Sequence, residues 1–248
     1  MSTFWRDVWT VFWRDWVVLH RRLTKFLLSR MVTPLLYLVA FGWGLGRSVS
    51  MGQGSYLDFL VPGILALNSM NLSFNSVTPV HAERVYHRSL EEYLLAPIRP
   101  EAFVFGKVLA ALLRSLLSSL IILVLAYLFG AHVQISVLFF IVLALNGIIF
   151  ASIGFFAAMK MGTYEEMAQV NTYILLPMSF LCGTFFSTAA LPFALRFFID
   201  ALPLTHASLL LRHLATGQGA TPFSLAMLIG YAVVTLALSC YAFRRLRP

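Results

Sequence analysis

Hydrophobic residues fall into six long blocks along this sequence, separated by short stretches rich in charged or turn-forming residues. The blocks cover about 26–46, 56–80, 102–129, 135–159, 167–187 and 222–243. A helix needs roughly 20 mostly apolar residues to cross the hydrocarbon core of a membrane. Because backbone polar groups at that depth must bond within their own segment, such blocks predict helices. We therefore expect an all-α polytopic membrane protein with six transmembrane helices in a single domain, 1–248.

Aromatic and basic residues alternate along 1–25, ahead of the first block. The aromatic positions recur at helical spacing and are Trp5, Trp9, Phe12, Trp13 and Trp16. The basic positions are Arg6, Arg14, Arg21 and Arg22. This combination is typical of a helix that lies at the level of the lipid headgroups. We expect an N-terminal interfacial amphipathic helix, which either anchors the chain or takes part in gating or partner contact.

The stretch 188–220 is apolar but interrupted by four residues that break helices. These residues are Pro192, Pro203, Gly217 and Gly219. Neither piece between them is long enough to span a membrane, and broken helices at membrane depth are tolerated where protein surrounds them. We expect short re-entrant helices at the outer side, before the sixth transmembrane helix.

The longest charged interval, 81–101, lies between the second and third blocks. Its charged residues are Glu83, Arg84, Arg88, Glu91, Glu92, Arg99 and Glu101. Each charge at the centre of a membrane helix costs about 2.5–3.5 kcal/mol, so this interval is an aqueous loop. Its apolar positions are Val85, Leu90, Tyr93 and Leu94. Their spacing predicts a short amphipathic helix, which Pro97 ends. A structured helix in this loop suggests a docking surface.

Two of the apolar blocks contain a marked number of uncharged polar residues. The second block carries Asn68, Asn71, Asn75 and Thr78, at steps that place them in one stripe along a helix. The fifth block is interrupted by Pro177 and carries Asn171, Thr172 and Ser179. Polar side chains within a membrane face protein or water rather than lipid. They form either hydrogen bonds between helices or the lining of a transport path.

Composition and charge support a membrane protein and indicate its orientation. Of the 248 residues 60 % are hydrophobic and 11 % charged, against about 45–50 % and 25 % in soluble domains. The net charge is +8, but the basic residues flank apolar blocks instead of forming one patch, so we expect no nucleic-acid partner. Fourteen of the 18 lysines and arginines lie on the side that holds both termini in a six-helix topology. The positive-inside rule therefore places both termini in the cytosol.

The sequence lacks the motifs that would give this chain an energy source or a catalytic centre. It has no G-x-x-x-x-G-K-[ST] phosphate loop, no G-x-S-x-G elbow and no H-E-x-x-H pair. His206 and His213 are seven residues apart, but no cysteine or carboxylate accompanies them, so we expect no metal site. We interpret Arg114, inside the third block, as reaching back to the cytosolic boundary or binding an anionic headgroup. A membrane path without an energy source favours a permease driven by a separate subunit.

Three segments, in order along the chain, resemble motifs of one known family. They are YLDFLVPGI at 56–64, RSLEEYLLAP at 88–97 and LPLTHA at 202–207. Over essentially its whole length the chain resembles the permease subunits of type-2 ABC exporters, such as those for nodulation factors, polysaccharides and drugs. The resemblance implies a multi-pass protein of the bacterial inner membrane that forms a homodimer in contact with membrane lipid.

The resemblance also implies how such a permease is powered. Two cytosolic ABC ATPase subunits would bind ATP and Mg, so that this chain holds no cofactor. The 83–96 helix would be the coupling helix, and the smaller charged loop 160–166 a second contact. The residues expected at these contacts are Arg84, Arg88, Glu91, Glu92, Tyr93, Leu94, Glu165 and Glu166.

We therefore expect the transmembrane subunit of an ATP-driven exporter. Its substrate would be amphipathic, a lipid, a glycolipid or polysaccharide, or a hydrophobic drug, moved out of the cytosol or the inner leaflet. The alternative is a secondary transporter or channel that acts alone. An intramembrane enzyme would need a titratable cluster at one depth, which the sequence does not contain.

Overall fold

The computed structural model describes residues 3–40, 56–87, 90–183 and 192–246, and within these ranges all regular structure is helical. The first half contains α1 (Thr3–His20), α2 (Leu23–Tyr37), α3 (Tyr56–Val85), α4 (Leu90–Leu95) and α5 (Pro100–Leu128). The second half contains α6 (Val137–Lys160), α7 (Tyr164–Val170), the π-helical segment η2 (Asn171–Leu175), α8 (Leu176–Leu181), α9 (Phe193–Asp200), α10 (Pro203–Ala215) and α11 (Pro222–Arg244). The predicted all-α membrane fold is confirmed.

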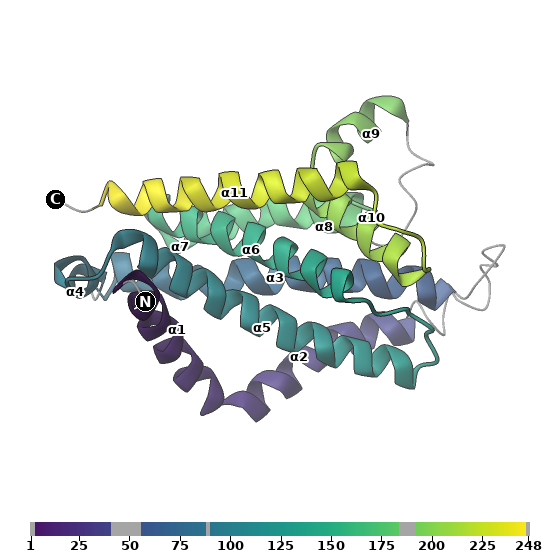
Figure 1. Cartoon of the computed structure of the whole chain (residues 1–248), viewed down its shortest axis with the longest axis horizontal. Coiled ribbons are helices and arrows are strands. Elements are labelled where there is room, and N and C mark those ends of the chain that lie inside the picture. Colours follow the sequence, from purple (N-terminus) through teal and green to yellow (C-terminus); the bar gives the residue numbers. More distant parts are fainter. Residues whose placement is uncertain (1–2, 41–55, 88–89, 184–191, 247–248) are drawn as a thin grey trace.

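The long helices α3, α5, α6 and α11 run side by side and form the body of the molecule (Figure 1). The helices α1 and α4 and the end of α11 gather at one end of this bundle, and α9 and α10 lie toward the other. The buried core is continuous across α3, α5, α6 and α10. Of the described helices long enough to cross a membrane, α3 is the most enclosed, with 78 % of its most apolar window buried.

Five helices of the described ranges are long and apolar enough to cross a membrane. They are α2 extended to Ala40, α3, α5, α6 and α11. The predicted fifth block is helical over α7, η2 and α8, but the π-helical turn divides it. Pro177 explains this division, because it has no N–H to donate to the carbonyl of Tyr173 four residues earlier. A membrane crossing by this fifth block, which would complete the six, stays a prediction. The end of the block, at 184–187, lies outside the described residues.

Glycines allow the closest approaches between helices. A Cβ atom on Gly154 of α6 would lie 2.7 Å from the carbonyl oxygen of Phe74 on α3. A Cβ atom on Gly106 of α5 would lie 2.7 Å from the Cβ of Val11 on α1. Small residues at helix contacts are the common means of close packing in membranes, where the hydrophobic effect does not drive helices together.

The helix α1 has the two-sided character predicted for 1–25, although it ends at His20. Val8, Val11 and Leu19 are buried, most closely against α5, whereas Trp5, Trp9 and Trp13 are at least half exposed. The chain then turns sharply into α2, so that the two helices form an elbow beside α5 (Figure 1). Exposed tryptophans on one face suit a helix at the membrane interface.

The charged interval 81–101 differs from its predicted form. The helix α3 continues through it to Val85 and closes where the N–H groups of Tyr86 and His87 both donate to the Ala82 carbonyl, at 3.0 Å each. The predicted helix over 83–96 is therefore wrong in its extent. Its place is taken by the last residues of α3 and by α4, which has only six residues.

The stretch 188–220 contains the two short helices expected there, in the residues described. The helix α9 projects from the bundle in Figure 1, whereas α10 is mostly buried and packs against α3, α6 and α11. Arg212 holds α10 in place, since its Nε donates to the Phe59 carbonyl at 3.2 Å and its Nη2 to the Gly183 carbonyl. The guanidinium also lies 3.8 Å from the centre of the Phe59 ring.

Candidate functional site

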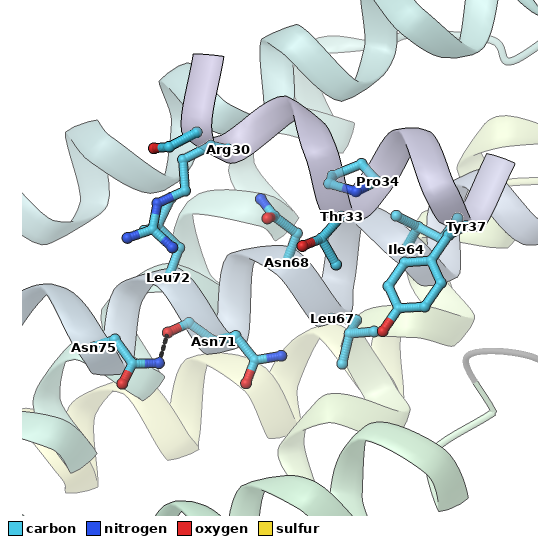
Figure 2. Close-up of a pocket in the computed structure, with 11 residues that line it drawn as sticks. Arg30, Thr33, Pro34, Tyr37, Ile64, Leu67, Asn68, Asn71, Leu72 and Asn75 are labelled. Atoms are coloured by element: carbon cyan, nitrogen blue, oxygen red, sulfur yellow. Dashed lines mark hydrogen bonds between the residues drawn. The ribbon is translucent and has the colours of Figure 1, made fainter. Parts of the chain in front are cut away.

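The predicted polar stripe, Asn68, Asn71, Asn75 and Thr78, lies on the side of α3 that faces α2 and η2. The side chain of Asn68 donates to Ser118 Oγ on α5 at 3.0 Å. The side chain of Asn75 donates to the carbonyl oxygen of Asn71 at 2.7 Å, one helical turn away (Figure 2). Thr78 Oγ1 is buried and has no hydrogen-bond partner among the described residues. Of these four residues, only Asn68 donates a hydrogen bond to another described helix.

A first cavity, of about 150 Å³, lies between α2 and α3. From α3 it is lined by Asn68, Asn71 and Asn75, with apolar neighbours. From α2 it is lined by Ser29, Arg30, Thr33, Pro34 and Tyr37. Figure 2 shows Arg30, Thr33 and Tyr37 of α2 facing the asparagines of α3. Besides apolar side chains, the described walls of the cavity thus consist of uncharged polar groups and one cation, Arg30.

Two further cavities, of about 230 Å³ each, continue the first toward η2. The second is lined by Asn171, Thr172 and Ser179, and it shares Tyr37 and Asn71 with the first. The third is lined by Asn75, Thr78, Tyr164, Met167, Ala168 and Asn171, among others. Because Asn71, Asn75 and Asn171 each belong to two of the cavities, the three form one string. The structure brings all seven residues predicted for a path together along it.

The lining from α2 was not predicted. Ser29, Thr33 and Tyr37 follow one another at intervals of four residues, so the same spacing argument that found the stripe on α3 would have found them. The block 26–46 was predicted as an apolar span, and the contact between α2 and α3 is a tertiary feature that the sequence does not display.

A cluster of charged residues joins α1, α3 and α5 beside the interval 81–101. Lys107 Nζ lies 3.2 Å from Asp15 Oδ1 and 3.7 Å from Glu83 Oε2, and Arg14 Nη2 lies 3.7 Å from Glu83 Oε1. Lys107 is only 6 % exposed. A buried lysine is tolerated when carboxylates neutralise it. We call these four residues the ionic cluster.

Two of the described side chains of the short helix α4 hold it against the bundle. Leu90 is 2 % exposed. The Tyr93 ring lies 5.0 Å from that of Phe103 on α5, and the Arg14 guanidinium carbon lies 5.1 Å from the centre of the Tyr93 ring. The predicted coupling residues Arg88, Glu91, Glu92 and Leu94 lie outside the described residues, the last three in their side chains only.

The loop 160–166 is held against the end of α3. Arg84 donates from Nη1 and Nη2 to the carbonyls of Met159 and Met161. The ring of Tyr86 stacks on that of Tyr164 at 4.8 Å. Arg84, predicted to contact a partner, is thus engaged within the chain.

The two glutamates of this loop behave differently. Glu166 accepts from the Gly162 N–H at 2.7 Å, and its own N–H donates to Thr163 Oγ1 at 3.2 Å, as residues that cap a helix do. Glu165 is exposed and takes part in no hydrogen bond or ion pair of the described residues. Both side chains are exposed, but Glu165 is the one that no hydrogen bond of the described residues already engages.

Comparison with known proteins bears on the same features. A family model described as ABC-2 type transporter matches residues 6–216. The chain belongs to the ABC-2 type transporter family. It is accordingly a membrane permease, and as such a transmembrane subunit that is not itself catalytic.

Relatives in this family resemble the chain over most of its length. Nodulation protein J of Bradyrhizobium diazoefficiens is 31 % identical over 243 residues, which cover 96 % of this chain and 93 % of that protein. Nodulation protein J of Rhizobium meliloti is 30 % identical over the same shares. The inner membrane transport permease YadH of Escherichia coli K12 is 25 % identical, over 77 % of this chain and 76 % of YadH. The predicted resemblance to exporter permeases is confirmed.

Proposed function

We propose that this ABC-2 permease is the membrane subunit of an ATP-driven exporter of an amphipathic substrate. Two cytosolic ATPase subunits bind ATP and Mg, and two copies of this chain form the membrane part. The observation that carries the proposal is the string of three cavities along α2, α3 and η2, lined by the seven polar residues of the predicted path.

The chemistry of the string supports an amphipathic substrate rather than a small cation. Amide and hydroxyl side chains both donate and accept hydrogen bonds, as the hydroxyl groups of a sugar or a lipid headgroup require. In the part of the chain that the structure describes, no carboxylate lines the three cavities, and Arg30 is their one charged residue. A path for protons or metal cations would need acidic groups at this depth. Lipids, glycolipids or polysaccharides, and hydrophobic drugs all fit.

The interval 81–101 is suited to carry force from an ATPase into the membrane. It connects the end of α3 with the start of α5, so a displacement of α4 acts on both helices. Leu90 and Tyr93 hold α4 against the bundle, and the ionic cluster ties the neighbouring helices to α1. In this proposal Glu91 and Glu92 form the charged contact with the ATPase, and Glu165 adds a smaller one.

The orientation follows from charge. With 81–101 on the cytosolic side, the lysines and arginines concentrate in the cytosol, as the positive-inside rule requires. Both termini are then cytosolic, the protein lies in a bacterial inner membrane, and α9 with α10 faces the outer side.

The proposal is tested by transport in vesicles that contain the chain with or without its ATPase. We expect ATP-dependent movement of a fluorescent glycolipid only when both are present. Glu91→Ala with Glu92→Ala should lower transport and transport-linked ATP hydrolysis about tenfold, because contacts of a charged pair at an interface contribute on the order of 1–2 kcal/mol. Asp200→Ala removes a carboxylate far from this surface, on α9, and serves as the control.

Two results would contradict the proposal. Movement of the glycolipid by the chain alone, without any ATPase, would favour a stand-alone transporter or channel. Full coupling in the doubly substituted variant, with normal assembly of the complex, would remove the glutamates from the contact.

A further inference from the structure

A larger cavity, of about 550 Å³, lies where the α1–α2 elbow meets α3 and α5. Four cations line it, namely Arg22, Lys25, Arg30 and Arg114. Most of the other lining is apolar, and no acidic residue is among the described residues that line it. We call it the basic cavity. It shares Ser29, Arg30, Leu72 and Asn75 with the first cavity of the string, so the two are continuous.

Arg114 is the most unusual of the four cations because of its depth. It lies 14 residues from either end of α5, or about 21 Å along the axis in each direction. Its Nη1 donates to the carbonyl oxygen of Ser76 on α3, at 3.3 Å. Arg114 therefore points across to α3 and into the basic cavity from the middle of its helix. A charge held at such a position is costly unless a group of opposite charge or water balances it.

Among the described residues no carboxylate forms an ion pair with these cations, and the charge of Asp15 acts on Arg114 only from beyond ion-pair distance. Within the residues that the structure describes, no carboxylate oxygen lies within 4 Å of Arg22, Lys25, Arg30 or Arg114. Lys107 differs from Arg114 in this respect, although both residues lie on the same face of α5. Lys107 has two carboxylates of the ionic cluster as partners, whereas the polar contact of Arg114 is a backbone carbonyl.

We infer that the basic cavity binds the phosphate-bearing headgroup of a membrane amphiphile. Guanidinium groups suit phosphate oxygens, because their N–H donors form a planar fork that matches two oxygens at once. The apolar side chains, such as Leu19, Phe26 and Leu72, would contact the part of the molecule that leads to its acyl chains. Basic pockets between transmembrane helices are a recognised means of holding anionic lipids.

The inference stands apart from the proposed export activity, because it concerns binding at equilibrium to the chain without ATPase. Arg30 belongs to both the basic cavity and the first cavity of the string. A headgroup held there would lie at the entrance to the string, next to the elbow of the N-terminal helix.

Lipid retention by the purified full-length chain tests this inference. The chain is placed in nanodiscs of equal parts phosphatidylglycerol and phosphatidylcholine and then extracted, and bound lipids are counted by native mass spectrometry. We expect the anionic lipid to be retained in preference to the zwitterionic one. Arg30→Gln with Arg114→Gln should lower this preference about tenfold, through lost charge-assisted hydrogen bonds. Arg6→Gln with Arg245→Gln removes the same charge from exposed positions and should preserve it.

Two further variants and a competitor keep the outcome clear. Arg30→Lys with Arg114→Lys retains the charge and should retain most of the preference, and Arg30→Gln alone serves if the double variant does not fold. Inorganic phosphate, added at the ionic strength of the assay, distinguishes a soluble anion from a lipid. Unchanged preference in the folded glutamine variants, or complete displacement of the lipid by inorganic phosphate, would overturn the inference.

Discussion

The helix α3 has two polar faces, and the comparison between them separates packing from function. On the face toward α5 and α6, Ser115 Oγ donates to Ser69 Oγ at 2.9 Å, and the Asn146 amide donates to the Ala66 carbonyl at 3.0 Å. On the face toward α2 and η2, Asn71 and Asn75 line cavities. Similar residue types thus serve as interhelical bonds on one face and as an open lining on the other.

The difference teaches that a polar residue within a membrane is informative only together with its partner. From the sequence, the polar stripe on α3 could form hydrogen bonds between helices or line a transport path. Asn68, which donates to Ser118, belongs to the packed kind, although it also borders the first cavity. Asn71, Thr78 and Asn171 belong to the lining. The two faces should therefore respond differently to substitution.

The largest effect is expected on the packed face, at Gly154. Gly154→Leu places a Cβ within 2.7 Å of the Phe74 carbonyl oxygen and the Val77 side chain, so α6 must move away from α3. We expect the free energy of unfolding to fall by about 3 kcal/mol, at the upper end for overpacking. Thermal unfolding in detergent measures this.

The matched control for this substitution is Gly230→Leu on α11. A Cβ there would meet nothing within 4 Å, and leucine favours a helix more than glycine does, so the unfolding midpoint should not fall. Equal losses at both positions would mean that the contact of α3 with α6 is not close.

A much smaller effect is expected from the serine pair on the same face. Ser115→Ala removes a hydrogen bond between α5 and α3, and such bonds in membrane proteins contribute about 0.6 kcal/mol. We expect this loss in the free energy of unfolding and no change in transport. The double variant with Ser69→Ala should lose slightly more than the single one, because it also removes the long hydrogen bond from Ser69 Oγ to the Leu143 carbonyl, at 3.5 Å. A loss of transport with intact stability would place this face in the path.

The sequence predicted the helices of this protein better than the contacts between them. The bounds of α3, α5, α6 and α11 agree with the apolar blocks to within a few residues. The reason is that the thickness of the hydrocarbon core sets the number of apolar residues in a membrane helix. The spacing of Asn68, Asn71 and Asn75 was sufficient to place them on one face. Their opening toward α2 depends on how two helices pack, which hydropathy does not specify.

Charged residues were harder to interpret. Arg84 was assigned to a partner contact, but its Nη1 and Nη2 groups donate to the carbonyls of Met159 and Met161. Lys107 and Arg114 share a face of α5, yet one meets carboxylates and the other a cavity. A sequence displays a charge but not whether its partner lies within the chain, in another subunit or in the membrane.

The central claim is that the face of α3 toward α2 and η2 lines a path open to water and substrate. Labelling of single cysteines tests it most directly, in a functional chain whose Cys182 and Cys240 have been replaced by alanine. We predict that a small water-soluble thiol reagent modifies Asn71→Cys, that substrate slows this reaction, and that Ser69→Cys, one helical face away and fully buried, does not react. Equal reactivity at both positions, or none at Asn71→Cys, would contradict the account.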